Sequence, residues 1–229
     1  MCDLNGMDAT PTRLRIDFVS DVVCPWCAVG LMSLERALER TRGEVEAEIH
    51  FQPFELNPQM PAEGEDAEGH LQRKYGMSAE QAAANQQVIV DRGAALGFTF
   101  DMARRSRIYN TFDAHRLLHW AEGEGEGLQR ALKHALLRAY FSDGRDVSDH
   151  DTLAAIAAEA GLAEGRAREI LGSDAFADEV RIGEQFFQSR GIRAVPAIIF
   201  EGRHLVSGGQ PPELFEQALR QIAAEKRQG

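Results

Sequence analysis

Alternation of apolar and polar residues marks two segments near the N-terminus. Residues 14–18 and 45–52 both follow this pattern, which is typical of strands with one buried face. Between them, apolar residues recur at helical spacing over 28–38, and Gly43 ends the run. A helix that connects two strands in this way predicts a β-α-β unit with parallel pairing.

A second region with strand character lies near the C-terminus. We expect Ser173 or Asp174 to cap a helix that runs to about residue 189. The apolar segment 196–200 predicts a buried strand, and 204–206 predicts its hairpin partner. Consecutive prolines at 211 and 212 then start a closing amphipathic helix.

The middle of the chain, 57–173, contains no segment with strand periodicity. Its predicted helices cover 71–75, 78–96, 110–121, 128–141, 152–160 and 164–171, and the acidic, glycine-rich segment 122–127 is expected to be a flexible hinge. The predicted fold class is α/β, a thioredoxin-like fold with a large helical insertion. Residues 10–56 and 174–229 would form the discontinuous thioredoxin-like domain, and 57–173 the inserted helical domain.

Composition and charge restrict the partners. The chain has 229 residues with 25 Lys and Arg against 36 Asp and Glu, a net charge of −11. This balance argues against a nucleic acid or an anionic membrane surface as partner, because both require clustered positive charge. The first ten residues have no apolar stretch, and the apolar run 194–200 is too short to span a bilayer. We therefore expect a cytoplasmic protein.

The candidate chemistry lies in the sequence Cys24-Pro25-Trp26-Cys27, between the first predicted strand and helix. Pro25 fits the first helical turn, where its missing N–H costs nothing. Cys24 then falls close to the N-cap, where unpaired amides and the helix dipole favour a thiolate. Two thiols one helical turn apart in this setting predict a redox-active disulfide.

Metal binding and inert structural thiols are the alternative interpretations of this motif. A zinc or iron–sulfur site needs about four ligands, but the only other cysteine is Cys2, in a polar segment where it is expected to be an incidental thiol. His115 and His119 are four residues apart, yet Arg116 stands where a zinc-protease motif needs glutamate. We predict no bound metal.

Several segments together resemble the DsbA family of thiol–disulfide oxidoreductases, and specifically its FrnE-like branch. They are Asp21–Cys27, Pro53–Pro58, Ala114–Leu118, Val195-Pro196 and Gly208–Pro211. The resemblance implies a thioredoxin fold with a redox-active disulfide and a cis proline beside it. The best-known members are periplasmic, which differs from the compartment expected here and leaves the direction of electron flow open.

The resemblance also assigns roles. It makes Cys24 the exposed attacking thiol and Cys27 the buried resolving thiol. It makes Val195-Pro196 the cis dipeptide, whose backbone would pair with an extended substrate.

Four further residues are candidates for the site. Pro25 and Trp26 belong to the motif, and Trp26 is either packing or substrate-facing. Asn110 and His115 are candidates for lining the site, although Asn110 also fits a helix cap.

Three functions remain. The first is a thiol–disulfide oxidoreductase or isomerase that acts on protein or small-molecule thiols and disulfides, with no bound cofactor and with glutathione as a candidate substrate. The second is a glutathione-dependent transferase or isomerase of the kappa-class or hydroxychromene-carboxylate type, although such proteins usually carry serine where Cys24 stands. The third is a non-catalytic redox-sensing or binding module. The oligomeric state stays open.

Overall fold

The central sheet joins the two ends of the chain. A computed structural model describes residues 10–228, so Cys2 lies outside the described residues. Four strands are arranged in the order β2-β1-β5-β6. They are β1 (Thr12–Ser20), β2 (Val45–Pro53), β5 (Ala197–Phe200) and β6 (His204–Ser207). β2 pairs with β1 in parallel, whereas β5 is antiparallel to both β1 and β6. The two strand-like regions of the sequence thus form one sheet, as predicted.

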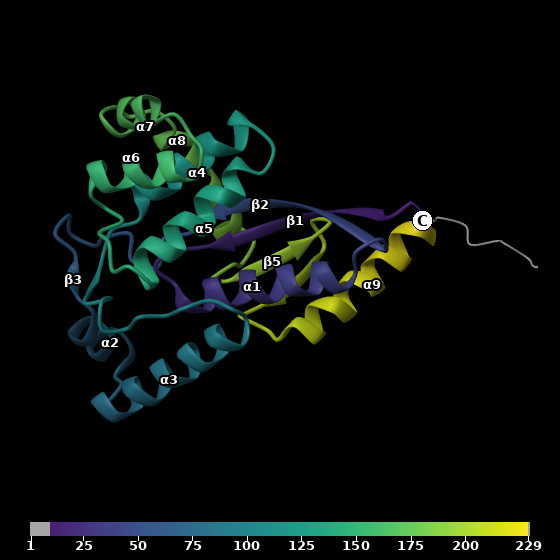
Figure 1. The fold of residues 1–229 in the computed structure, drawn as a ribbon, viewed down its shortest axis with the longest axis horizontal. Coiled ribbons are helices and arrows are strands. Elements are labelled where there is room, and N and C mark those ends of the chain that lie inside the picture. The colour runs from purple at the N-terminus through teal and green to yellow at the C-terminus, as the bar shows by residue number, and fades with distance from the viewer. Residues whose placement is uncertain (1–9, 229) are drawn as a thin grey trace, which may run out of the picture.

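Helices cover both faces of this sheet. α1 (Pro25–Arg40) and α9 (Pro212–Gln228) lie side by side along one face (Figure 1). Their core includes Phe18 of β1, whereas the next residue, Val19, belongs to a smaller cluster with Phe187 of α8 (Ala177–Ser189). The alternation of β1 side chains therefore places one core on each face of the sheet. This arrangement confirms the α/β thioredoxin-like fold.

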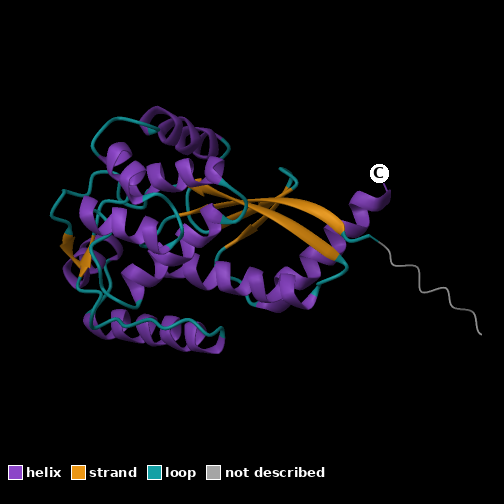
Figure 2. Cartoon of the chain, turned by 45° about the horizontal axis from the view of Figure 1, so that its top comes forward, coloured by secondary structure: helices purple, strands orange, loops and turns teal. Residues whose placement is uncertain are grey.

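The segment between β2 and α8 is mainly helical and gathers at the end of the sheet remote from the C-terminus (Figure 2). Its helices are α2 (Ala67–Tyr75), α3 (Ala79–Ala95), α4 (Phe112–Glu124), α5 (Leu128–Phe141), α6 (His150–Glu159) and α7 (Glu164–Leu171). The Ser78 cap of α3 forms a capping box with Gln81. None of the helices in residues 10–228 is long and apolar enough to cross a membrane.

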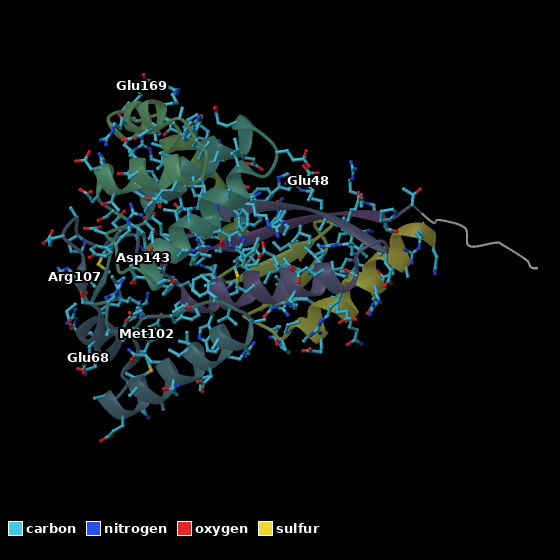
Figure 3. All side chains as sticks on the ribbon, in the orientation of Figure 1. Glu48, Glu68, Met102, Arg107, Asp143 and Glu169 are labelled. Atoms are coloured by element: carbon cyan, nitrogen blue, oxygen red, sulfur yellow. The ribbon has the colours of Figure 1, made fainter. Side chains whose placement is uncertain are left out.

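The expectation of no strand in this segment was wrong. β3 (Glu65–Asp66) and β4 (Arg107–Ile108) form a separate two-stranded sheet. Arg107 also donates hydrogen bonds to the carbonyl oxygens of Glu63 and Gly64, and Figure 3 shows it at the same end of the molecule as Glu68 of α2. Two-residue strands are too short to show alternation, so their pairing leaves no periodic signal in the sequence.

Two predicted boundaries also differ. α8 begins after Phe176, whose φ of 62° is left-handed, because the Ser173 hydroxyl accepts from the Ala175 N–H and keeps that segment in a turn. The proposed hinge is partly helical, because α4 continues to Glu124. Within it, the Glu122 carboxylate bonds the His50 ring of β2 at 2.6 Å. Only Gly125, Glu126 and Gly127 lie outside the helices.

Candidate active site

The Cys-Pro-Trp-Cys motif forms the start of α1. β1 ends at Ser20, and a short loop leads to Cys24, which is the N-cap of α1 with extended backbone angles (φ −92°, ψ 112°). Pro25 occupies the first turn, and the amides of Cys27 and Ala28 donate to the Cys24 carbonyl at 3.1 and 3.3 Å. The N-terminal end of the helix therefore lies at the Cys24 side chain.

Both thiols are free, and they differ in surroundings. Cys24 is 4% exposed and Cys27 is 0% exposed. Cys24 is the more accessible thiol, but it is much less exposed than expected for the attacking group. Burial raises the pKa of the Cys27 thiol well above its ordinary value, and the adjacent Cys24 side chain raises it further. Cys27 is thus held as a thiol inside the protein.

Cys24 lies directly against the loop before β5. Its Sγ donates a hydrogen bond to the Val195 carbonyl oxygen at 3.7 Å. The Val195-Pro196 peptide bond is cis, as the family resemblance implied. The contact requires Gly30 in α1, because a Cβ there would lie 3.1 Å from Pro196 Cγ. The fold therefore brings the dithiol and the proline dipeptide together from opposite ends of the chain.

A groove of about 850 Å³ opens over Cys24. Cys24, Pro25, Trp26 and Val195 form one part of its wall. The remaining wall comes from the segment after β2 and from α2 and α3, with further residues from β4 and from three loops. These residues are Phe54, Glu55, Leu56, Asn57, His70, Leu71, Lys74, Tyr75, Met77, Ala82, Asn85, Gln86, Ile89, Arg105, Ile108, Arg193 and Ala194, together with Val23 beside the motif.

Charged groups in this wall are mostly cationic. The wall contains three cationic residues, Lys74, Arg105 and Arg193, and one acidic residue, Glu55. The Lys74 ammonium donates to the Leu56 carbonyl oxygen at 2.7 Å and is close enough to Cys24 for their charges to interact. Negative charge on a bound molecule would therefore be stabilised in the groove.

Trp26 has a second contact behind this wall. The Arg92 guanidinium of α3 lies 5.7 Å from the Trp26 ring centroid and donates to the Gly209 carbonyl oxygen at 2.6 Å. A Cβ on Gly209 would lie 2.9 Å from the Trp26 carbonyl oxygen, so glycine is needed there. Trp26 therefore both packs and borders the groove, and Arg92 ties α3 to the motif.

Glu55 is the acidic group of the groove wall. It is 4% exposed; Arg181 of α8 donates to its Oε2 and to Oε2 of Glu184. Glu55 Oε1 has no hydrogen-bond partner within residues 10–228. Burial, followed by the nearby Glu184 charge, raises the pKa of Glu55 to about 7. Its carboxyl group therefore changes protonation near neutral pH.

A second group of ionisable residues lies behind the dithiol, away from the groove. Asp21 Oδ2 accepts from the Leu56 amide at 2.7 Å, and Asp21 Oδ1 lies 3.3 Å from His115 Nε2. Burial opposes ionisation of Asp21, but the hydrogen bond and charge of His115, together with hydrogen bonds from Leu56 and Thr111, outweigh it and keep the Asp21 pKa below its ordinary value. Lys133 of α5 is completely buried in the same region.

The predicted site residues fall into two sets. Cys24, Cys27, Pro25, Trp26, Val195 and Pro196 come together at the dithiol. Asn110 and His115 do not border the groove. Asn110 Oδ1 accepts from the Phe112 amide at 2.9 Å at the start of α4, which is a capping contact. His115 is buried against Asp21, on the inner side.

Sequence reasoning missed three residues near the dithiol, Glu55, Lys74 and Lys133. Lys133 had a detectable signal, because it interrupts the apolar stripe of its helix at a buried position. Among the described residues, no cluster of three or more His, Cys, Asp or Glu side chains is arranged to hold a metal ion.

This combination of a four-stranded mixed sheet, a dithiol at a helix start and an adjacent cis proline defines a thioredoxin-fold redox protein. A profile of the DsbA-like thioredoxin domain matches residues 15–220. The chain therefore belongs to the DsbA-like thioredoxin family, and it is a disulfide oxidoreductase or isomerase of that family.

Similar proteins agree with this assignment. A probable DsbA oxidoreductase from Streptomyces coelicolor is 37% identical, with 93% of this chain and 91% of that chain covered and a TM-score of 0.85. The uncharacterised protein YwbO of Bacillus subtilis is 26% identical over 90% of this chain and 96% of its own length. The cytosolic disulfide reductase DsbM of Pseudomonas aeruginosa, solved with glutathione, shares the fold at 16% identity, with 92% and 100% of the chains covered and a TM-score of 0.64.

Proposed function

We propose that this protein is a cytoplasmic thiol–disulfide oxidoreductase in which Cys24 attacks the substrate and Cys27 resolves the intermediate. The observation that carries the proposal is the position of Cys24 at the start of α1, next to Val195 and at the bottom of the groove. In a reducing compartment, a free dithiol in this position is a working redox pair rather than a structural staple. The proposal keeps residues 10–56 with 174–229 as the thioredoxin-like domain and 57–173 as the inserted domain.

The reaction has two exchanges. The Cys24 thiolate attacks one sulfur of a substrate disulfide, a mixed disulfide forms, and the other substrate sulfur leaves as a thiolate. The Cys27 thiolate then attacks Cys24 Sγ, the mixed disulfide breaks, and the second substrate thiolate leaves. Two electrons have passed to the substrate, and Cys24 and Cys27 are joined by a disulfide. The reverse sequence oxidises a dithiol substrate, and no bound cofactor is needed for either direction.

The groove supports small acidic thiols as one substrate class, and glutathione is the candidate. Glutathione carries two carboxylates, and Lys74 and Arg193 supply cationic groups near Cys24. DsbM, which shares this fold, was solved with glutathione. Protein disulfides are the other class, because the Val195 backbone beside Cys24 offers pairing to an extended chain.

The glutathione-transferase alternative has one observation in its favour. 2-Hydroxychromene-2-carboxylate isomerase has the same fold, with a TM-score of 0.64 at 12% identity. The second thiol, Cys27, supports the exchange reaction instead, since a transferase or isomerase of that type needs no resolving cysteine. A glutathione-conjugation assay run beside an insulin-reduction assay discriminates between the two.

Single cysteine variants test the mechanism. Cys24→Ser should abolish insulin reduction, whereas Cys27→Ser should accumulate mixed disulfides at Cys24 because no second thiol resolves them. Cys2→Ser is the matched control and should keep full activity. Mass spectrometry of acid-trapped intermediates identifies the adducts. Full turnover of protein substrates by Cys27→Ser would replace the two-thiol mechanism with a monothiol, glutathione-linked one.

A further inference from the structure

Arg105 is a buried cation in the wall of the groove. The residue is 8% exposed, and it lines the same groove as Cys24. Within residues 10–228 its side chain takes part in no ion pair, and its one hydrogen bond runs from Nε to the Tyr140 hydroxyl at 3.0 Å. Burying a charge without a counterion is unfavourable in general. The described part of the protein therefore leaves this guanidinium without a carboxylate.

Aromatic side chains of α5 hold the guanidinium in one orientation. Its central carbon lies 5.5 Å from the centroid of the Tyr140 ring and 5.7 Å from that of the Phe141 ring. The Tyr140 hydroxyl accepts from Arg105 Nε and donates to the Arg107 carbonyl oxygen at 2.9 Å. Ring faces offset part of the cost of burying a cation, but they do not satisfy its N–H donors.

The loop that carries Arg105 between α3 and β4 is fixed as well. The Asp101 amide donates to the Phe141 carbonyl oxygen at 2.8 Å, and the Arg105 amide donates to the Asp101 carbonyl oxygen at 3.2 Å. Gly144 packs against the same loop with a φ of 69°, and a Cβ there would lie 2.5 Å from the Arg104 carbonyl oxygen. Backbone and side-chain contacts together therefore set the position of Arg105.

The two terminal nitrogens of Arg105 are available to a bound molecule. Nε is the nitrogen that Tyr140 engages, so Nη1 and Nη2 make no hydrogen bond within the described residues. Neither is among the polar atoms that are sealed from solvent without a partner, and the open space beside Arg105 is the groove. A guanidinium presents its N–H donors in a rigid fork that matches the two oxygens of a carboxylate.

The acidic residues of the loop and of the groove wall are bonded to other arginines. Asp101 accepts from the Arg104 amide at 3.1 Å, and its carboxylate lies 3.2 Å from Arg104 Nε. Glu55, the acidic residue of the groove wall, accepts from Arg181. Neither carboxylate therefore serves as the counterion of Arg105.

The other cations of the groove wall are placed differently. Lys74 Nζ donates to the Leu56 carbonyl oxygen at 2.7 Å and to Asn57 Oδ1 at 2.6 Å. Arg193 is exposed. Water weakens ion pairs at exposed positions, whereas a buried cation interacts more strongly with a carboxylate that reaches it. Arg105 is therefore the best prepared of the three to bind an anionic group.

We propose that Arg105 binds a carboxylate of the substrate and so selects small thiols and disulfides that carry one. This inference rests on the proposed function and adds a specificity residue to it. The groove volume of about 850 Å³ lies within the range of roughly 300–1,000 Å³ that is typical of small-molecule sites. The groove thus has room for a molecule that places its sulfur at Cys24 and a carboxylate at Arg105. Arg105 takes no part in the exchange of sulfur bonds.

Ligand binding to the Cys24→Ser protein measures recognition without exchange. S-Methylglutathione, which has two carboxylates and no free thiol, is titrated by calorimetry beside its dimethyl ester. Adding Arg105→Gln should weaken the binding of S-methylglutathione about tenfold and leave the binding of the ester unchanged. Arg105→Lys keeps the charge without the fork and should recover part of the loss. Arg104→Gln removes the same charge from the same loop, at a side chain 64% exposed, and should change neither ligand.

An equal loss for both ligands would overturn the inference, because Arg105 would then support the shape of the groove and not bind a carboxylate. Unchanged binding of S-methylglutathione, or no binding to the Cys24→Ser protein, would overturn it as well. With both thiols present, Arg105→Gln should raise KM for glutathione disulfide about tenfold at nearly constant kcat. Loss of insulin reduction in the wild type would instead contradict the proposed function, because the calorimetric titration requires no exchange.

Discussion

The two sides of the dithiol differ in what surrounds them. On the outer side, Cys24 borders a groove whose wall contains Lys74, Arg193 and a loop backbone at Val195. On the inner side, Cys27 is sealed from solvent among Asp21, His115 and Lys133, all of them buried. The outer side is open to a bound molecule, whereas the inner side is closed to one.

This difference separates groups that a bound molecule can contact from groups that it cannot. Groups in the groove act on whatever molecule binds, so their removal should change affinity and substrate preference. Groups behind the dithiol act on Cys27 and on the fold, so their removal should affect all substrates equally. Variants on each side test this division.

The largest expected effect comes from Asp21 on the inner side. Asp21→Ala leaves the buried amides of Val22 and Leu56 without their acceptor and His115 without its partner. We expect the free energy of unfolding to fall by about 2–4 kcal/mol, measured by urea denaturation. Asp21→Asn, which keeps one oxygen acceptor, should lose less. If Asp21→Ala were as stable as the wild type, the contacts of Asp21 behind the dithiol would not stabilise the fold.

A smaller effect, confined to substrate binding, is expected on the outer side. Lys74→Met removes a cation that faces the groove near Cys24. KM for glutathione disulfide should rise about tenfold while kcat stays close to the wild-type value, the signature of lost uniform binding. A neutral aromatic disulfide serves as the matched substrate, and its KM should hardly change. If kcat fell equally for both substrates, Lys74 would affect all substrates alike, as is expected of the buried groups behind the dithiol, and would not act through substrate binding.

The smallest expected effect concerns Glu55 and pH. The folded protein binds the Glu55 proton up to about pH 7, whereas the unfolded chain releases it near the ordinary value of 4.5. The unfolded state therefore binds fewer protons between these values, and the Glu55 contribution to stability decreases as pH rises from about 4.5 to about 7.

Glu55→Gln should remove this dependence while keeping an oxygen that accepts from Arg181. Its gain in stability should be absent at pH 4 and should grow as the pH rises toward 8. Thermal melts of both proteins across this range measure it. A gain of the same size at every pH would show that Glu55 does not retain its proton near neutrality.

Sequence analysis succeeded where a periodic pattern or a local motif carries the information. Alternation over 14–18 and 45–52 identified β1 and β2, and the Cys24–Cys27 motif located the start of α1. It failed where structure depends on contacts between distant segments. β3 and β4 form through pairing alone, and their two-residue lengths carry no pattern.

The site shows the same limit. The Val195-Pro196 dipeptide is visible in the sequence, but the contact of Val195 with Cys24 joins two residues that are 171 positions apart. Lys133 reads as one polar residue in an amphipathic helix, and only the packing of α5 on β2 places it beneath α1. His115 was selected for its motif and helix position, whereas the fold pairs it with Asp21 on the inner side.

The separation of Cys24 from Val195 also has a consequence for biosynthesis. A ribosome makes both cysteines early and the loop that covers Cys24 near the end of the chain, 171 residues later. Strand β5, which fixes that loop beside β1, is made equally late. For most of translation, the nascent chain carries an uncovered pair of reactive thiols. During those seconds the finished fold cannot yet protect the pair from premature oxidation.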